Sequence, residues 1–361
     1  MLDKQLIDEF GMYINSSNWT YFKYKNNHNQ NQWNCICSAM DWIDVAIEYI
    51  NNHPLSALGA YQSIELYSYL TCVDIIVEAI EQLHRVIYST PKRIFEDDSE
   101  CFNGNQFNQN DRDYFKHLRA CFGAHPVNLN DPEDENKKAK RFASWSGGNF
   151  GIDDFSVILY SNKIHGEDIL LGLKFNQIDT FVEKYYNHLS ELKMELNRQY
   201  EAFCETKRKQ RIEYCDDTVT LLIILQNENK ERLNYDYYRT TIEDLLLIYQ
   251  TTITCNENIL LVDQFRSALK VLVDEIYHNL QDMVFMDLEN DKFLYPTKCS
   301  LPRGWEYWVE KVSQVKSGTG YPPFIWMDGL KRVFEGRFVF EYQDAIELYI
   351  LIHAAMYRAT L

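Results

Sequence analysis

Residues 66–87 read LYSYLTCVDIIVEAIEQLHRVI, and the spacing of their apolar side chains decides the fold class. These side chains alternate in steps of three and four residues, at Leu66, Tyr69, Val73, Ile76, Ile80, Leu83 and Ile87. Such spacing forms one apolar seam along a single long helix. The sequence therefore predicts a long amphipathic helix that packs against other helices.

A second helical pattern lies upstream of this seam. It predicts an apolar stripe at helical steps, made of Trp42, Val45, Ala46 and Tyr49. The polar residues 51–54, which end in Pro54, break the run. Two long helices joined by a short turn pack antiparallel, so we expect a helical bundle here.

A short helix follows a polar loop at residues 95–110. Asn110 or Asp111 is its predicted N-cap, and Gly123 and Pro126 are expected to end it. Its apolar positions are Tyr114, Phe115, Leu118 and Phe122.

Strand patterns then appear at residues 155–160 and 169–175, which predicts a small β-hairpin at about residues 142–175. From Ile178 a long helix is expected to reach about Cys204. The basic run at residues 207–211 is either a linker or the end of that helix. The remaining chain carries two further helical stripes, at residues 262–280 and 345–356.

The length of 361 residues suggests two domains, at about 150 residues per domain. We expect a helical bundle with a β-hairpin at residues 1–206, and a helical region of unknown role at residues 212–361. The predicted fold class is mostly α.

Composition limits the protein class further. At 46% hydrophobic and 14% aromatic residues the chain can bury a full core, which excludes wholesale disorder. No apolar run approaches ~18 residues, so no membrane partner is expected. The first residues lack a basic region followed by an apolar one, which predicts a cytoplasmic protein.

The net charge of −17 argues against a surface that coats nucleic acid, because phosphate contacts need Lys and Arg. Any RNA site must then be a local basic pocket. The nine cysteines are scattered and lack paired metal-ligand spacing. Phosphate loops, zinc-protease helices, EF-hand loops and nucleophile elbows are absent from the sequence, and residues 147–151 lack the context of a dinucleotide site. We therefore predict no metal and no cofactor.

The best candidates for catalytic residues lie at 112–126, where Arg, Lys and His residues cluster in an otherwise acidic chain. Arginine offers a planar charged fork for phosphate oxygens, and histidine passes protons near neutral pH. Arg119 and His125 are six residues apart, which is about 240° of rotation on an unbroken helix. Gly123 and Pro126 break the helix, so His125 can turn back toward Arg119. Arg112 lies seven residues before Arg119, so both share a face and can line one basic patch.

Residues 119–126, Arg-Ala-Cys-Phe-Gly-Ala-His-Pro, resemble the Arg-x(4–6)-His motif of the HEPN superfamily. The resemblance covers about residues 35–205 and implies an antiparallel helical bundle. Many HEPN proteins are metal-independent endoribonucleases in toxin–antitoxin, abortive-infection and CRISPR-linked defence. In these proteins two copies of the motif usually meet across a dimer. By this resemblance, Arg119 and His125 would be the catalytic pair.

A second match to the motif runs from Arg112 to His117. Arg119 and His125 are favoured because they precede Pro126 and follow the bundle helices. Candidate supporting residues are Arg112, Asp113, Lys116, His117, Asp74 and Glu78. For these, the structural alternatives are a helix cap for His125, a solvated face for the Arg and Lys residues, and plain surface for His117, Asp74 and Glu78.

Two further features have both a nucleic-acid-binding and a purely structural interpretation. The basic runs at residues 137–141 and 207–211 either steer RNA or are solvated segments. The aromatic residues Trp305, Trp308, Tyr321 and Trp326 either stack bases or pack in the core.

The resulting hypothesis is a HEPN-type endoribonuclease in bacterial defence or toxin–antitoxin function. Its expected partners are an RNA substrate such as tRNA or mRNA, a second copy of the chain, and an antitoxin or sensor protein. The alternative is a non-catalytic helical protein for binding, dimerisation or sensing. The acidic charge and the apolar Ala120 after Arg119 favour that alternative.

Overall fold

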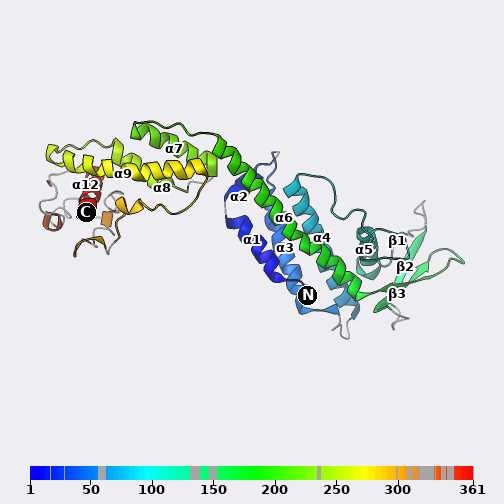
Figure 1. Ribbon diagram of the computed structural model, residues 1–361. Helices are drawn as coiled ribbons and strands as arrows, with labels where there is room; N and C mark the ends of the chain where they lie inside the picture. The colour runs from blue at the N-terminus through cyan, green and yellow to red at the C-terminus, as the bar shows by residue number, and fades with distance from the viewer. Residues whose placement is uncertain are drawn as a thin grey trace. The chain divides into compact units, whose positions relative to one another are not determined.

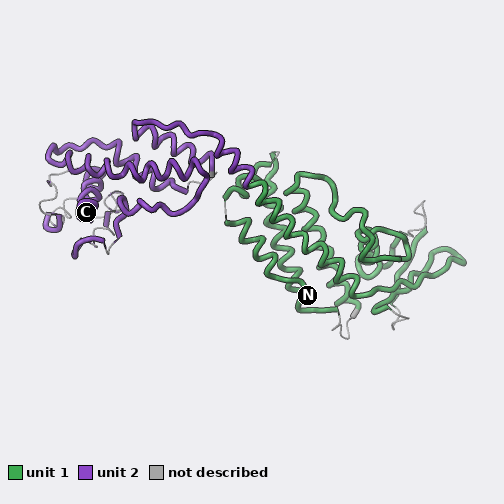
Figure 2. Tube along the Cα trace, in the orientation of Figure 1, with its two compact units in different colours: residues 1–200 green, residues 201–361 purple. Residues whose placement is uncertain are grey.

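The computed structural model is mostly helical and carries one small antiparallel sheet (Figure 1). It describes residues 1–16, 18–27, 29–55, 62–130, 139–145, 153–233, 237–297, 300–305, 307, 311–312, 314, 316, 329, 331–334, 339 and 345–360. Two compact units are distinguished by their internal contacts: unit 1, residues 1–200, and unit 2, residues 201–361 (Figure 2).

The helices of unit 1 are α1 (Lys4–Ser16), α2 (Asn18–Lys25), α3 (Trp33–Asn52), α4 (Gln62–Tyr88), α5 (Asp111–Arg119) and α6 (Phe175–Lys209), the last of which continues into unit 2. The apolar seam predicted at residues 66–87 lies on α4, and all seven of its residues are buried. Because α3 packs along α4 and the seam faces the core, the prediction of a long packed helix is confirmed.

The stripe predicted on α3 is partly wrong. Trp42 and Val45 are 54% and 57% exposed, whereas Ala46 is buried. The buried face of α3 is formed instead by Ile36, Ala39, Ile43, Ala46, Ile47 and Ile50. Apolar residues occupy more than one side of this helix, and periodicity alone does not tell which side meets the core.

The sheet has four antiparallel strands in the order β1 (Leu129–Asn130), β2 (Lys140–Trp145), β3 (Phe155–Ser161) and β4 (Ile169–Leu173). The predicted hairpin corresponds to β3 and β4, in which Leu159 lies opposite Ile169. Strands β1 and β2 were not predicted from the sequence. Strand β2 reads KRFASW, and its basic start was interpreted as a charged loop.

Of the basic run at residues 137–141, the structure describes Lys140 and Arg141. Lys140 Nζ donates to Asn130 Oδ1 at 2.7 Å, and the buried Arg141 donates from Nη1 to the Glu167 carbonyl at 2.7 Å. Both side chains therefore hold the sheet and its neighbouring turn together.

Unit 2 contains α7 (Thr218–Leu233), α8 (Arg239–Gln250), α9 (Asn256–Asp282), the 3₁₀ turn η3 (Asp291–Phe293) and α12 (Ala345–Ala359). The predicted stripe on α9 is buried throughout, from Val262 to Leu280. On α12, residues 347–356 are all buried. Trp305 is also buried, as its core interpretation predicts; Trp308, Tyr321 and Trp326 lie outside the described residues.

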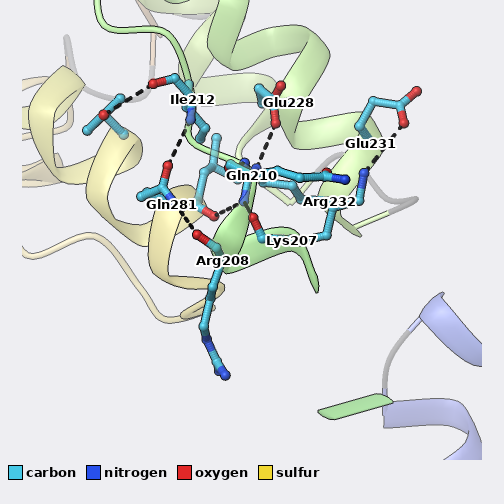
Figure 3. A network of polar contacts seen from close by, with 10 residues as sticks. Lys207, Arg208, Gln210, Ile212, Glu228, Glu231, Arg232 and Gln281 are labelled. Carbon is cyan, nitrogen blue, oxygen red and sulfur yellow. Dashed lines mark hydrogen bonds and ion pairs between the residues drawn. The ribbon is translucent and has the colours of Figure 1, made fainter. Parts of the chain in front are cut away.

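The basic run at residues 207–211 overlaps the end of α6, one of its two predicted interpretations: the helix ends at Lys209, and Gln210 and Arg211 follow it. The Arg232 side chain of α7 lies against that end (Figure 3). The Arg232 side chain is 1% exposed and donates to the Lys207 and Gln210 carbonyls and to Glu228 Oε2. A guanidinium at this position satisfies carbonyls that a helix end leaves free and complements the helix dipole. These contacts stabilise the end of α6.

Candidate functional site

Helix α5 carries most of the predicted site. Its N-cap is Asn110, one of the two predicted candidates, because Asn110 Oδ1 accepts from the Asp113 backbone N–H at 2.8 Å. Asp113 also accepts from Asn110 Nδ2 at 3.0 Å. Asp113 is exposed, and both its backbone N–H and its carboxylate bind the Asn110 side chain.

A single π-helical turn, η2 (Ala120–Ala124), follows Arg119 directly. Such turns are rare and are found frequently at functional sites. His125 leaves the turn: its backbone N–H donates to the Ala120 carbonyl at 3.1 Å, and its own carbonyl accepts from Asn128 N at 3.1 Å. The π turn therefore separates Arg119 from His125 where the sequence predicted a broken helix.

Gly123 has a different role from the one predicted. Its φ is not left-handed; what it supplies is space, because an added Cβ would lie 1.9 Å from Cδ2 of Tyr67 on α4. The absence of a side chain lets η2 lie against α4.

Arg112 lies in a cluster of three carboxylates on α4. Its side chain is 3% exposed, with Nε 3.1 Å from Glu81 Oε1, Nη1 3.2 Å from Asp74 Oδ1 and Nη2 3.0 Å from Glu78 Oε1. The carboxylates share one face of α4 because their positions differ by four and three residues. Burial alone would lower the pKa of Arg112, but Glu81 and Asp74 outweigh it and raise that pKa.

This arrangement corrects the expected open basic patch. Arg112 and Arg119 do lie on one side of α5, since both reach Asp74. Arg112, however, is neither solvated nor open to a phosphate, because each of its donor nitrogens already has a carboxylate.

Arg119 is the more accessible arginine, with 35% of its side chain exposed. Its Nη1 lies 3.1 Å from Asp74 Oδ2, and its buried Nε has no hydrogen bond to any residue that the structure describes. Asp74 is mostly buried, in contrast to the surface position that was its alternative, and Glu78 is 56% exposed.

The two candidate histidines differ in their surroundings. His125 is exposed, and among the described residues its ring has neither a hydrogen bond nor an ion pair. His117 is half-buried, with its ring centroid 4.5 Å from that of Phe107. Lys116 is half-buried as well. Of the two motif matches, the pair Arg119 and His125 therefore has the more accessible side chains.

A histidine pair that the sequence analysis did not select lies between α4 and α6. His84 Nδ1 is 3.1 Å from His188 Nε2, and His188 Nδ1 is 2.8 Å from Glu191 Oε2. Burial lowers the pKa of both histidines; for His84 the neighbouring His188 lowers it further, and for His188 the nearby Glu191 partly offsets the effect. Only folding brings these residues together, since His84 and His188 are 104 positions apart.

The described residues contain no group of three or more His, Cys, Asp or Glu that could hold a metal ion. Within them, no helix is both long and apolar enough to cross a membrane. Comparison with protein-family models, curated proteins and solved structures finds no match for the chain.

Proposed function

We propose that the chain is a metal-independent endoribonuclease of HEPN type that acts in bacterial defence or as a toxin of a toxin–antitoxin pair. The observation that carries the proposal is the pair formed by Arg119 and His125, one at each end of a single π turn and both open to solvent. The motif resemblance of residues 119–126 adds the class of reaction.

In this proposal each residue has one chemical role. The His125 imidazole takes the proton of a ribose 2′-OH, or gives a proton to the departing 5′-oxygen. The Arg119 guanidinium holds the phosphate and stabilises the negative charge that grows on its oxygens in the transition state. The 2′-oxygen attacks phosphorus and the bond to the 5′-oxygen breaks, which leaves a 2′,3′-cyclic phosphate and a 5′-OH.

Asp74 and Arg112 support this pair from α4 and α5. Asp74 fixes one nitrogen of Arg119, and the buried Arg112 holds Asp74 in turn. Among the described residues Nη2 of Arg119 has no partner, and in this proposal it binds the phosphate. The resemblance also implies a second copy of the chain at the site, and unit 2 as a sensor or partner-binding region is part of the same proposal.

The test is cleavage of an RNA pool by the purified full chain in EDTA, with product ends mapped. Cleavage to cyclic-phosphate ends that disappears in both Arg119→Ala and His125→Ala supports the proposal. Cleavage that survives both substitutions contradicts it.

A second candidate function, a non-catalytic binding or dimerisation module, is favoured by one specific feature. An apolar groove of about 340 Å³ lies between α3 and α4, and it is lined by Trp42, Ile75 and Glu78 among others. An exposed tryptophan beside a groove is typical of an interaction surface. Under this alternative Trp42→Ala abolishes self-association while RNA remains intact with every variant.

A further inference from the structure

A polar pocket of about 160 Å³ lies beside α5, between the loop at residues 102–106, strand β4 and the start of α6. Its lining residues include Asn103, Gln106, Tyr114, Asp153, Lys174 and Gln177. Pockets for drug-sized ligands have volumes of roughly 300–1,000 Å³, so this pocket suits a single flat ring system.

The pocket presents hydrogen-bonding groups that the fold does not use. Within the described part of the chain, the side chains of Asp153, Lys174 and Gln177 make no hydrogen bond or ion pair. Asn105 is the contrast, because its amide binds the Phe102 and Gln109 carbonyls and so shapes the loop. The free groups include a carboxylate, an ammonium and an amide, which together both donate and accept.

A glycine in β4 makes room for the carboxylate. An added Cβ at Gly172 would lie 1.8 Å from Asp153 Oδ2, so the carboxylate packs directly on the strand backbone. Glycine weakens a strand interior and often marks a close approach. The position of the carboxylate thus depends on the absence of a side chain at residue 172.

Hydrogen bonds made by adjacent residues bring the segments that carry Asp153 and Lys174 together. Asp154 N donates to the Leu173 carbonyl at 2.9 Å, and Phe175 N donates to Asp154 Oδ2 at 2.9 Å. Asp153 and Lys174 are the neighbours of these anchored residues. Tyr114 lines the same pocket as Asp153: burial is the main reason that the pKa of Tyr114 rises to about 12, with Cys121 and then Asp153 contributing.

We propose that this pocket binds a guanine base of the RNA substrate. Guanine carries O6 and N7 acceptors, which Lys binds, beside N–H donors that suit the Asp153 carboxylate. The Gln177 amide supplies a further donor and acceptor, and Tyr114 contributes an aromatic wall. The opposite charges of Asp153 and Lys174 favour a neutral base with both donors and acceptors over a phosphate.

The inference rests on the proposed function and gives it a substrate preference. Tyr114 precedes Arg119 by five residues, which is about 7.5 Å along the axis of α5 and about 140° around it. The base pocket and the phosphate clamp are therefore carried by different faces of the same short helix. A guanosine close to the cleaved bond is the expected determinant of the cleavage position.

The test is calorimetric titration of the full chain in EDTA with 5′-GMP, 5′-AMP, 5′-CMP and 5′-UMP. GMP is expected to bind about tenfold more tightly than the other three. Asp153→Asn and Gly172→Ala should each weaken GMP binding by about tenfold, since the first removes the acceptor charge and the second displaces the carboxylate. Glu167→Gln makes the same acid-to-amide change at an exposed residue outside the pocket; it is the matched control and should bind GMP as the wild type does.

Several outcomes overturn the inference: equal affinity for the four nucleotides, GMP binding that Asp153→Asn leaves unchanged, or ribose 5-phosphate binding as tightly as GMP. Thermal melting separates misfolding from loss of binding, and the isosteric Asp153→Asn keeps the test valid if Gly172→Ala does not fold. Arg119→Ala distinguishes the two proposals. If Arg119→Ala abolishes cleavage but retains GMP binding, both proposals are supported. If GMP binds but neither the wild type nor any variant cleaves RNA, the pocket proposal stands and the nuclease proposal is contradicted.

Discussion

Asp74 bridges Arg112 and Arg119: its Oδ1 lies 3.2 Å from Arg112 Nη1, and its Oδ2 lies 3.1 Å from Arg119 Nη1. The buried arginine thereby fixes the carboxylate that orients the accessible one. Asp74 is a positioning residue in this arrangement, because it acts on a substrate phosphate only through Arg119.

Asp74→Asn should lower the cleavage rate by roughly 10- to 100-fold, as loss of an orienting partner commonly does. The amide keeps the shape of the side chain but removes the charge that holds Arg119. We expect kcat to fall with little change in KM, measured under steady-state conditions in EDTA. Glu78→Gln is the control, since Glu78 is 56% exposed and contacts Arg112 alone of the two arginines. Equal losses from both substitutions would contradict a positioning role for Asp74.

Arg112→Met should destabilise unit 1 by about 3–5 kcal/mol, because removing one partner of a buried ion cluster leaves the others uncompensated. Glu81, which is 6% exposed, would lose its cation, and Asp74, which is 14% exposed, would keep only Arg119. The measurement is chemical denaturation of the full chain. Arg198→Met gives the comparison, since the Arg198 side chain is 71% exposed and its ion pair with Glu195 should contribute about 1 kcal/mol or less. A loss from Arg112→Met no larger than that of the control would show that the cluster does not stabilise the fold.

The fold was more predictable than this cluster. The seam on α4 is a local repeat, and a repeat every three or four residues specifies a buried helix face without knowledge of its partner. The burial of Arg112 depends on residues 31 to 38 positions away, and no local pattern reports it. One signal was available: Asp74, Glu78 and Glu81 have the spacing of a single helix face, and a carboxylate row beside an arginine-rich helix predicts ion pairs.

The strands and the glycines show the same difference between local patterns, which were predicted, and contacts between distant residues, which were not. Strands β3 and β4 are apolar and were predicted, whereas β2 begins with two basic residues that pair within the sheet and its turn. Gly123 was predicted to end a helix, whereas Gly172 had no predicted role. The need for glycine at each position comes from a side chain elsewhere in the chain: Tyr67 for Gly123 and Asp153 for Gly172. Close approaches of this kind become visible only in three dimensions.

Gly123→Ala should disturb the π turn, because the added methyl group meets the Tyr67 ring at 1.9 Å. We expect a lower melting temperature and a loss of cleavage, since η2 connects Arg119 to His125. Gly11→Ala is a matched control: its added Cβ meets nothing within 4 Å on α1, and it should stabilise the fold by about 0.4–1 kcal/mol. The double variant Gly123→Ala with Tyr67→Ser should recover part of the loss. Failure of this rescue would mean that the Tyr67 contact is not what requires glycine.

Acid should destabilise the protein through its buried histidines. Burial lowers the pKa of His188, and complete burial lowers the pKa of His353 to about 4, both below the unfolded value of 6.5. The unfolded chain then binds protons more readily, so the stabilising contribution is full above pH 6.5 and is lost as pH falls toward the folded pKa. The free energy of unfolding should fall by up to about 1.4 kcal/mol per pH unit for each such histidine.

Denaturation between pH 4.5 and 7.5 measures this slope. His353→Leu removes one of the two groups from the core of unit 2 and should flatten the pH dependence without loss of stability at pH 7. An unchanged slope in this variant would show that His353 is not the group that takes up the proton.

The choice between the two motif matches has the sharpest test, because they differ in their histidines. His125→Ala should reduce cleavage by roughly 100- to 10,000-fold, the usual contribution of a general acid or base. His117→Ala should leave the rate within a few-fold of wild type, since its ring packs against Phe107 and its motif partner Arg112 is held by three carboxylates. Melting temperatures of both variants exclude misfolding as the cause. The reverse result, with cleavage lost only in His117→Ala, would transfer the catalytic histidine from the exposed end of the π turn to α5. It would also require the Arg112 cluster to open when RNA binds.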